Sequence, residues 1–132
     1  MSIRPLNIGI IGLGTVGTGL IKFLSKNKKL IFSRTEREIN ISAICAKNKN
    51  KNREINIKDF RWVHDPFGII DDKEIDVIVE LIGGEDNPAK SIVEKSLLNK
   101  KHVVTANKSL LAKHGHYLAL LAEEQQVNLN FE

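Results

Sequence analysis

The sequence predicts one α/β domain built on a doubly wound parallel sheet, and three observations carry this prediction. Short apolar runs alternate with segments of helical periodicity along the 132 residues. The run at 76–82, DVIVELI, is apolar almost throughout, as in a central strand that is covered on both faces. The glycine-rich turn GLGTVGTG directly follows the first apolar run and opens a helix. A chain of this length is enough for one domain with a real core.

The first half of the chain is expected to form two strands. Residues 7–11 form the first strand, and the helix after the glycine turn carries apolar residues at helical spacing. These are Val16, Leu20, Phe23 and Leu24. A polar loop is expected over about 26–38, and INISAICA at 39–46 is the second strand.

The middle of the chain is irregular by composition, whereas the segment after it has clear helix signals. FRWV at 60–63 is a candidate short strand, and HDPFG at 64–68 predicts a turn. After the central strand, Asn87 is the expected N-cap and Pro88 the first helical residue. The buried stripe of that helix is expected to be Ile92, Val93 and Leu97.

The last third of the chain predicts a strand, a helix and a strand. HVVTA at 102–106 is the fourth strand, and a helix begins near Asn107. His114 and Gly115 are typical of a helix end, so this helix is expected to break or bend there before it resumes. VNLNF at 127–131 starts a fifth strand.

Composition excludes several classes of function. Hydrophobic residues make up 42% and charged residues 27%, no apolar run has the roughly 18 residues of a membrane span, and no signal peptide is evident, so a cytoplasmic location is expected. Much of the net charge of +4 comes from KNKNKNR at 47–53, which is too short and too poor in aromatic residues to predict nucleic-acid binding. The single cysteine, Cys45, lies in an apolar segment and predicts a buried thiol, and the histidines have no zinc-like spacing.

The glycine turn carries the first functional prediction. Gly12, Gly14 and Gly17 form G-x-G-x-x-G between a strand and a helix, which is the context of a Rossmann-type dinucleotide-binding turn. Gly12 allows the tight turn, Gly14 lets the backbone approach a pyrophosphate, and Gly17 lets the helix pack against the strand. The alternative is a purely structural glycine turn.

The residues after the second strand bear on the choice of cofactor. NAD-binding domains usually place an acidic residue there, on the ribose 2′-hydroxyl, whereas this chain has Ala46, Lys47 and Asn48. A missing carboxylate and a nearby cation favour NADP, with NAD as the alternative. Lys47 is therefore either a phosphate contact or an ordinary solvated lysine.

Three further residues mark the carboxyl edge of the sheet, where such folds bind ligands. Gly83 and Gly84 close the central strand and would permit close approach to a cofactor, although a left-handed turn would explain one of them. Glu80 is either a residue at the polar end of that strand or a site group.

Lys108 stands where the fourth strand gives way to a helix, and a cation there is disfavoured by the helix dipole. It would face the same crevice as the glycine turn, where it could contact ribose or nicotinamide, receive an anionic substrate and stabilise charge on a carbonyl oxygen. The alternative is a tolerated surface lysine. Asn107 is expected mainly as the N-cap and is a candidate cofactor contact.

The segments GLGTVGTG, DVIVELIGG, HVVTANKSLLAKHG and NFE, in this order, resemble the N-terminal NAD(P)-binding domain of homoserine dehydrogenase over essentially the whole chain, most weakly at about 28–75. The resemblance implies an oxidoreductase that reversibly reduces L-aspartate 4-semialdehyde to L-homoserine, on the route to threonine and methionine. It implies that Gly12, Gly14, Thr15, Val16 and Gly17 hold the pyrophosphate. Lys108 matches the lysine of the family's TANK motif, which contacts the cofactor and is implicated in catalysis.

Two departures from the family limit what the resemblance implies. The family commonly has Arg-Asp after the second strand, where this chain has Lys47-Asn48, so the NADP preference is a hypothesis. In the family, the substrate domain, the proton-donor lysine and much of the oligomer interface lie beyond the equivalent of Glu132. Residues 1–132 are therefore expected to be one truncated domain that binds cofactor without turnover. The complete enzyme would be a homo-oligomer. Glu132 matches a glutamate that helps to hold a monovalent cation, and this site is expected to be empty here.

Two other classes of protein share these features. A regulatory nucleotide sensor uses the same fold without catalysis, but such domains usually carry an acidic residue after the second strand and have no reason for VVTANK. Another amino-acid or semialdehyde dehydrogenase would be distinguished only by its substrate domain.

Overall fold

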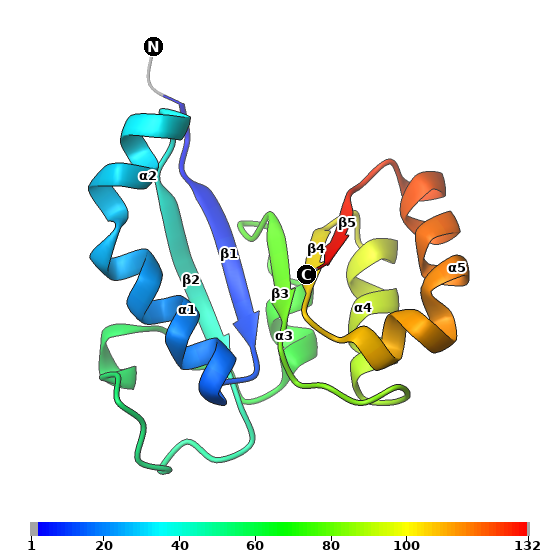
Figure 1. The fold of residues 1–132 in the computed structure, drawn as a ribbon, viewed down its shortest axis with the longest axis horizontal. Coiled ribbons are helices and arrows are strands. Elements are labelled where there is room, and N and C mark those ends of the chain that lie inside the picture. The colour runs from blue at the N-terminus through cyan, green and yellow to red at the C-terminus, as the bar shows by residue number, and fades with distance from the viewer. Residues whose placement is uncertain (1–2, 132) are drawn as a thin grey trace.

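The computed structural model describes residues 3–131, in which five strands form one parallel sheet in the order β2-β1-β3-β4-β5 (Figure 1). The strands are β1 (Leu6–Ile11), β2 (Ile39–Cys45), β3 (Val77–Glu80), β4 (His102–Thr105) and β5 (Leu129–Phe131). Each pairing is parallel, and β3 lies at the centre with all four of its residues buried. The predicted parallel sheet and its central strand are confirmed.

Helices cover both faces of this sheet, so the winding is double as predicted. The helices are α1 (Thr15–Lys26), α2 (Lys28–Thr35), α3 (Pro66–Ile70), α4 (Ala89–Leu98) and α5 (Lys108–Gln125), with a 3₁₀ turn at Ile57–Asp59. Because side chains alternate along a strand, Ile10 packs in the cluster that contains Ile21 of α1, whereas Ile11 packs with α3, α4 and α5. Figure 1 shows α1 and α2 on one side of the molecule and α4 and α5 on the other.

A single bridge replaces the short strand expected at 60–63. Trp62 pairs in parallel with Ile44 on the outer edge of β2, where Ile44 N donates to Arg61 O and Val63 N donates to Ile44 O, both at 2.9 Å. The bridge takes the place of the third strand in the Rossmann order 3-2-1-4-5-6. The direction of winding therefore reverses between β1 and β3.

The polar loop expected over 26–38 is wrong, because most of it forms α2. Asn27 separates this helix from α1, and its side-chain Nδ2 donates to Phe23 O at 2.9 Å. None of the residues of α2 is buried, and a helix without an apolar face leaves no periodicity in the sequence. The helix α1 is confirmed, but Val16 and Phe23 are exposed, and its buried residues are Gly17 and Ile21.

The turn expected at 64–68 contains the start of α3. Asp65 is its N-cap and accepts a hydrogen bond from Phe67 N at 2.9 Å, and Pro66 occupies the first helical position. This arrangement is the usual N-terminal signal of a helix, and composition alone concealed it. The helix packs closely on the sheet because Gly9 lacks a side chain, and a Cβ atom there would overlap Ile69.

The sequence predicted a break or a bend at Gly115, and the break is wrong, since α5 runs through Gly115 without interruption, although Figure 1 shows this helix changing direction along its length. A glycine inside a helix costs about 1 kcal/mol relative to alanine, and the complete burial of Leu110 and Leu118 on either side of it offsets that cost. His114 does not end the helix but pairs with Asp86 on the loop after β3, with Nε2 and Oδ1 separated by 3.1 Å.

The start of α4 is shifted by one position from the prediction. Pro88 is the cap residue and Ala89 the first helical residue, but the Asn87 side chain still accepts a hydrogen bond from Ser91 N at 3.1 Å. The predicted buried stripe of this helix is confirmed, because Ile92, Val93 and Leu97 have no exposed surface.

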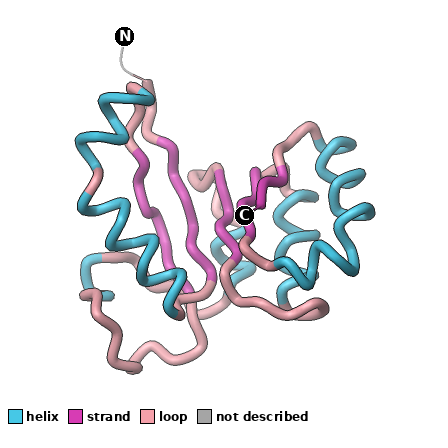
Figure 2. The backbone as a smooth tube through the Cα atoms, in the orientation of Figure 1, coloured by secondary structure: helices cyan, strands magenta, loops and turns pink. Residues whose placement is uncertain are grey.

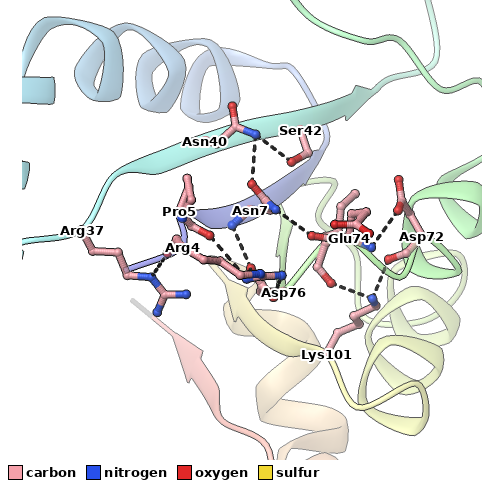
Figure 3. Close-up of polar contacts among 11 residues, drawn as sticks. Arg4, Pro5, Asn7, Arg37, Asn40, Ser42, Asp72, Glu74, Asp76 and Lys101 are labelled. Carbon is pink, nitrogen blue, oxygen red and sulfur yellow. Dashed lines mark hydrogen bonds and ion pairs between the residues drawn. The ribbon is translucent and has the colours of Figure 1, made fainter. Parts of the chain in front are cut away.

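Polar side chains tie the amino edge of the sheet together (Figure 3). Arg4 donates two hydrogen bonds of 2.8 Å to Asp76, which lowers the pKa of that carboxyl, and Asp76 also accepts from Asn7 N at 2.9 Å. Lys101 is buried and donates to the carbonyl oxygens of Asp72 and Ile75, both at 2.6 Å. The polar groups in these two sets of contacts have hydrogen-bond partners within the chain, so their role at the amino edge is to stabilise the fold.

Candidate functional site

The glycine turn brings the end of β1 against the end of β3. Gly12 has a φ of +109°, and a Cβ atom there would lie 2.6 Å from the carbonyl carbon of Leu81. A Cβ atom on Gly17 would overlap the carbonyl oxygen of Gly12. Both positions therefore require glycine for packing within the chain, as the sequence predicted for the tight turn and for the close approach of α1.

Gly14 differs from the other two glycines because nothing in the chain occupies the space beside it. It is the exposed N-cap of α1, and a Cβ atom there would meet no atom within 4 Å. Among the described residues, no side chain caps this helix, and its first turn contains no acidic residue. The N–H groups of Thr15, Val16 and Gly17 have no acceptor within the helix and carry its positive dipole end. This end of α1 fits a phosphate group.

A cavity of about 560 Å³ opens at the glycine turn, between the carboxyl ends of β2 and β3 and the starts of α3 and α4. Gly12, Gly14 and Lys47 line it, so the structure brings three of the predicted residues together. Lys51 and Arg53, which are not among the predicted site residues, line it as well. Figure 2 shows the long loop after β2 and the loop after β3 at this same edge.

Arg53 is the best-held cation of this cavity. Its Nε donates to Leu13 O at 3.3 Å, and its guanidinium carbon lies 5.7 Å from the centre of the Trp62 ring. The bridge between Trp62 and Ile44 places that ring beside β2, and the guanidinium that packs on the ring therefore lies at the cavity. The basic run at 47–53 was the sequence feature that could have indicated Arg53, but only this packing shows which cations of the run are held near the glycine turn.

The end of β3 is joined to the end of β4 through Glu80, which has no exposed surface. Its Oε1 accepts from the Thr105 hydroxyl at 2.8 Å, and its Oε2 accepts from Ile82 N at 2.8 Å and from Gly83 N at 3.2 Å. Of the two readings left open by the sequence, the structure shows a buried residue at the strand end that does not line the cavity.

Gly83 and Gly84 form an exposed turn that leaves β3. Their φ angles are +89° and +92°, so the backbone requires glycine at both positions, whether or not a ligand is present. Gly84 O accepts a hydrogen bond of 2.6 Å from Asn107 Nδ2, which links the turn to α5. Neither glycine lines the cavity.

Lys108 is the first residue of α5 and is exposed. Asn107 is confirmed as the N-cap, since its Oδ1 accepts from Leu110 N at 3.1 Å. Because β4 pairs in parallel with β3, Lys108 stands at the same edge of the sheet as the glycine turn. It lies outside the cavity lining, on the half of the sheet beyond the reversal of winding.

Other predicted features concern metals, membranes and the cysteine. Within residues 3–131, no group of three His, Cys, Asp or Glu side chains is arranged to hold a metal ion, and Glu132, with its predicted cation site, lies outside the described residues. None of the helices in the described part of the chain has the length and apolar content needed to cross a membrane. Cys45 is buried as predicted, and burial raises the pKa of its thiol.

A doubly wound parallel sheet with a G-x-G-x-x-G turn at its reversal point defines a dinucleotide-binding domain. Comparison with known proteins agrees with this class. The sequence model of the family described as "Homoserine dehydrogenase, NAD binding domain" matches residues 12–132. The chain therefore belongs to the family of NAD-binding domains of homoserine dehydrogenase.

Individual relatives support the same family. The homoserine dehydrogenase of Neisseria gonorrhoeae is 46% identical over 129 residues, which are 98% of this chain and 29% of that protein. The crystal structure of S. aureus homoserine dehydrogenase at pH 7.0 superposes with a TM-score of 0.91 at 42% identity, covering 98% of this chain and 33% of that one. The homoserine dehydrogenase from Thiobacillus denitrificans has a TM-score of 0.89 at 38% identity, over 98% and 30% of the two chains. The chain thus spans about a third or less of each of these three relatives.

Proposed function

We propose that residues 1–132 hold a pyridine dinucleotide with its pyrophosphate on the first turn of α1. The observation that carries this assignment is the open space beside Gly14, at an uncapped helix end that faces a cavity of about 560 Å³. Thr15, Val16 and Gly17 would donate their backbone N–H groups to phosphate oxygens. Gly12 allows the turn to pack against the backbone of Leu81.

The same cavity supports a preference for NADP over NAD. An extra phosphate on the ribose needs cations where NAD-binding domains usually carry an acidic residue. Lys47, Lys51 and Arg53 line the cavity after β2, and Arg53 is held by Leu13 O and by the Trp62 ring. We assign the 2′-phosphate to these cations, with Arg53 as a fork-shaped donor suited to phosphate.

The complete protein is proposed to be a homoserine dehydrogenase, which interconverts L-aspartate 4-semialdehyde and L-homoserine. When bound, the reduced cofactor supplies the hydride that the aldehyde carbon accepts, and the carbonyl oxygen gains a proton. Lys108 would contact the nicotinamide half of the cofactor and stabilise negative charge on that oxygen. Gly83, Gly84 and Asn107 would shape the backbone beside the nicotinamide half, at the edge where Lys108 stands.

Several parts of this function are assigned to sequence outside residues 1–132. The relatives are about three times as long as the matched segment, so we propose that the substrate-binding and proton-donor groups lie in such additional sequence. The cation site that includes Glu132 and the homo-oligomer interface would also depend on it. Residues 1–132 alone are then expected to bind cofactor without turnover.

The first experiment is a fluorescence titration of the chain with NADPH and NADH, together with Arg53→Gln and Lys26→Gln. The Arg53 variant should lose about tenfold or more in NADPH affinity, because a charge-assisted contact to the 2′-phosphate is removed, and little in NADH affinity. Lys26, at the far end of α1, is the control for charge alone. Tighter binding of NADH than of NADPH by the wild type would reject the NADP preference.

The second experiment separates an enzyme from a nucleotide sensor. Lys108→Ala in the full natural protein should lower the rate of homoserine oxidation by at least about 100-fold, as expected when a group that stabilises transition-state charge is removed. Lys28→Ala is the control, because Lys28 is likewise an exposed lysine at the first position of a helix, α2. A wild-type protein that binds NADPH but does not oxidise homoserine would be a regulatory domain or a dehydrogenase for another substrate.

A further inference from the structure

The turn after β3 and the start of α5 form one hydrogen-bonded unit, although both are at the surface. Glu80 Oε2 accepts from Ile82 N and Gly83 N, and Gly84 O accepts from Asn107 Nδ2 at 2.6 Å. The two-glycine turn is therefore held at its beginning and at its end. Backbone with positive φ at two consecutive glycines has wide conformational freedom, and these contacts remove it.

Thr105 connects the two halves of this unit. Glu80 and Thr105 are opposite each other in the parallel register of β3 and β4, at the last residue of each strand. The Thr105 hydroxyl donates to Glu80 Oε1 at 2.8 Å and accepts from Asn107 N at 3.0 Å. The carboxylate thus reaches the N-cap of α5 through a single hydroxyl.

The contacts of Glu80 indicate that its role is to fix the geometry of the neighbouring backbone rather than to stabilise the core. All three of its contacts are donated to it, which suits the ionised carboxylate, and no cation of the described residues pairs with it. Burial of a carboxylate costs free energy unless hydrogen bonds compensate for it, and an apolar residue would fill the centre of a parallel sheet at lower cost. What the carboxylate alone provides is a fixed path for the backbone at 81–84.

We infer that Glu80 is a positioning residue that acts through Thr105 and Asn107 to set the turn at 81–84 and the first turn of α5 in one arrangement, and thereby orients Lys108. This inference rests on the proposed function, because Lys108 has its role only there. Glu80 touches neither the cavity nor solvent, so its effect reaches the site through these contacts.

The test uses Thr105→Val, which removes the bridging hydroxyl at nearly constant shape, and Thr105→Ser, which restores it. Thr35→Val on α2 is the matched control, because the Thr35 hydroxyl likewise donates one hydrogen bond, to Ile31 O, and accepts one from a backbone N–H, that of Arg37, but lies on another element. Each variant of the full natural protein is measured for kcat, for NADPH affinity, for thermal midpoint, and for hydrogen exchange at the amides of Ile82 and Gly83.

Thr105→Val should lower kcat by about tenfold or more and speed exchange at both amides by about tenfold, since hydrogen bonds to a charged group are disrupted. NADPH affinity should change less than kcat, because the variant disturbs only the contacts to the nicotinamide half and leaves those of the pyrophosphate on α1 in place. Thr105→Ser should recover most of the loss, and Thr35→Val should behave as wild type.

A second variant, Glu80→Gln, keeps the shape but removes the charge, with the exposed Glu38→Gln as its control. It should also accelerate exchange at Ile82 and Gly83. A folded Thr105→Val or Glu80→Gln protein with wild-type kcat and wild-type exchange would overturn the inference, and so would failure of both variants to fold, which would make the network purely structural. Failure of the proposed function would appear differently, as a wild-type protein without NADPH binding or homoserine oxidation.

Discussion

Replacing Gly14 with alanine should weaken cofactor binding and leave the stability of the fold nearly unchanged. Replacing Gly17 with alanine should lower the stability of the fold. At Gly14 the backbone is extended, with φ −78° and ψ −156°, so alanine meets no positive-φ strain there, and the new methyl group would meet no atom of the chain within 4 Å. The loss of unfolded-state freedom and the poorer N-cap oppose each other, so the free energy of unfolding should change by less than about 1 kcal/mol.

The binding cost of Gly14→Ala follows from where its methyl group would lie. It would fill the space assigned to the pyrophosphate and hold the phosphate oxygens away from the N–H groups of α1. Loss of one such charge-assisted hydrogen bond is worth about 1.5–3 kcal/mol, which corresponds to roughly 10- to 150-fold in Kd. Calorimetric titration with NADPH measures the loss.

Gly17→Ala provides the comparison within the same turn. Its methyl group would overlap the carbonyl oxygen of Gly12, which is backbone and cannot rotate away. Overpacking of this kind typically costs about 1–3 kcal/mol, partly offset by the higher helix propensity of alanine. Urea unfolding should therefore show a less stable protein. Unchanged NADPH affinity in Gly14→Ala would refute the placement of the pyrophosphate, and unchanged stability in Gly17→Ala would refute the packing argument.

Two further predictions concern stability alone. Ile78→Ala, at a fully buried position in the central strand, should lower the free energy of unfolding by about 2–5 kcal/mol in urea, and a loss below about 1 kcal/mol would contradict the two-sided core. The hydrogen bonds from Arg4 hold the pKa of Asp76 below its ordinary value, so this carboxyl stabilises the fold above the unfolded pKa of about 3.9 and ceases to do so as pH falls through its lower folded pKa. Asp76→Asn should therefore flatten the loss of urea midpoint below about pH 4, and equal slopes for the two proteins would argue against this ion pair (Figure 3).

The elements predicted correctly are those whose signal lies within a few residues. The central strand predicted at 76–82 is confirmed as β3, over Val77–Glu80, because a strand covered on both faces is apolar at successive positions. Asn107 is confirmed as a cap because an amide oxygen at that position satisfies a free N–H of the helix. The motif residues Gly12 and Gly17 have the packing roles that were predicted, since their neighbours are fixed by the turn itself.

The elements predicted wrongly are those that depend on contacts between residues distant in the sequence, or that bury no residue and so leave no pattern in it. Gly115 lies inside a continuous helix because packing on both sides of it outweighs its low propensity. Helix α2 buries no residue, so hydrophobic periodicity could not show it. Arg53 is held at the cavity by Leu13 O and by the ring of Trp62, which bridges to β2. These contacts join segments that the linear pattern does not connect.

The sequence alone determined the fold class, the glycine turn and the family, because alternating apolar runs and short motifs are local and tolerate variation elsewhere. Tertiary structure decided which charges gather around the cavity and what Glu80 does. Its carboxylate contacts the turn that follows it and a hydroxyl 25 residues away, and that second contact exists only because β3 and β4 pair in one register. Register brings strand ends together in space, and no spacing along the chain reports it.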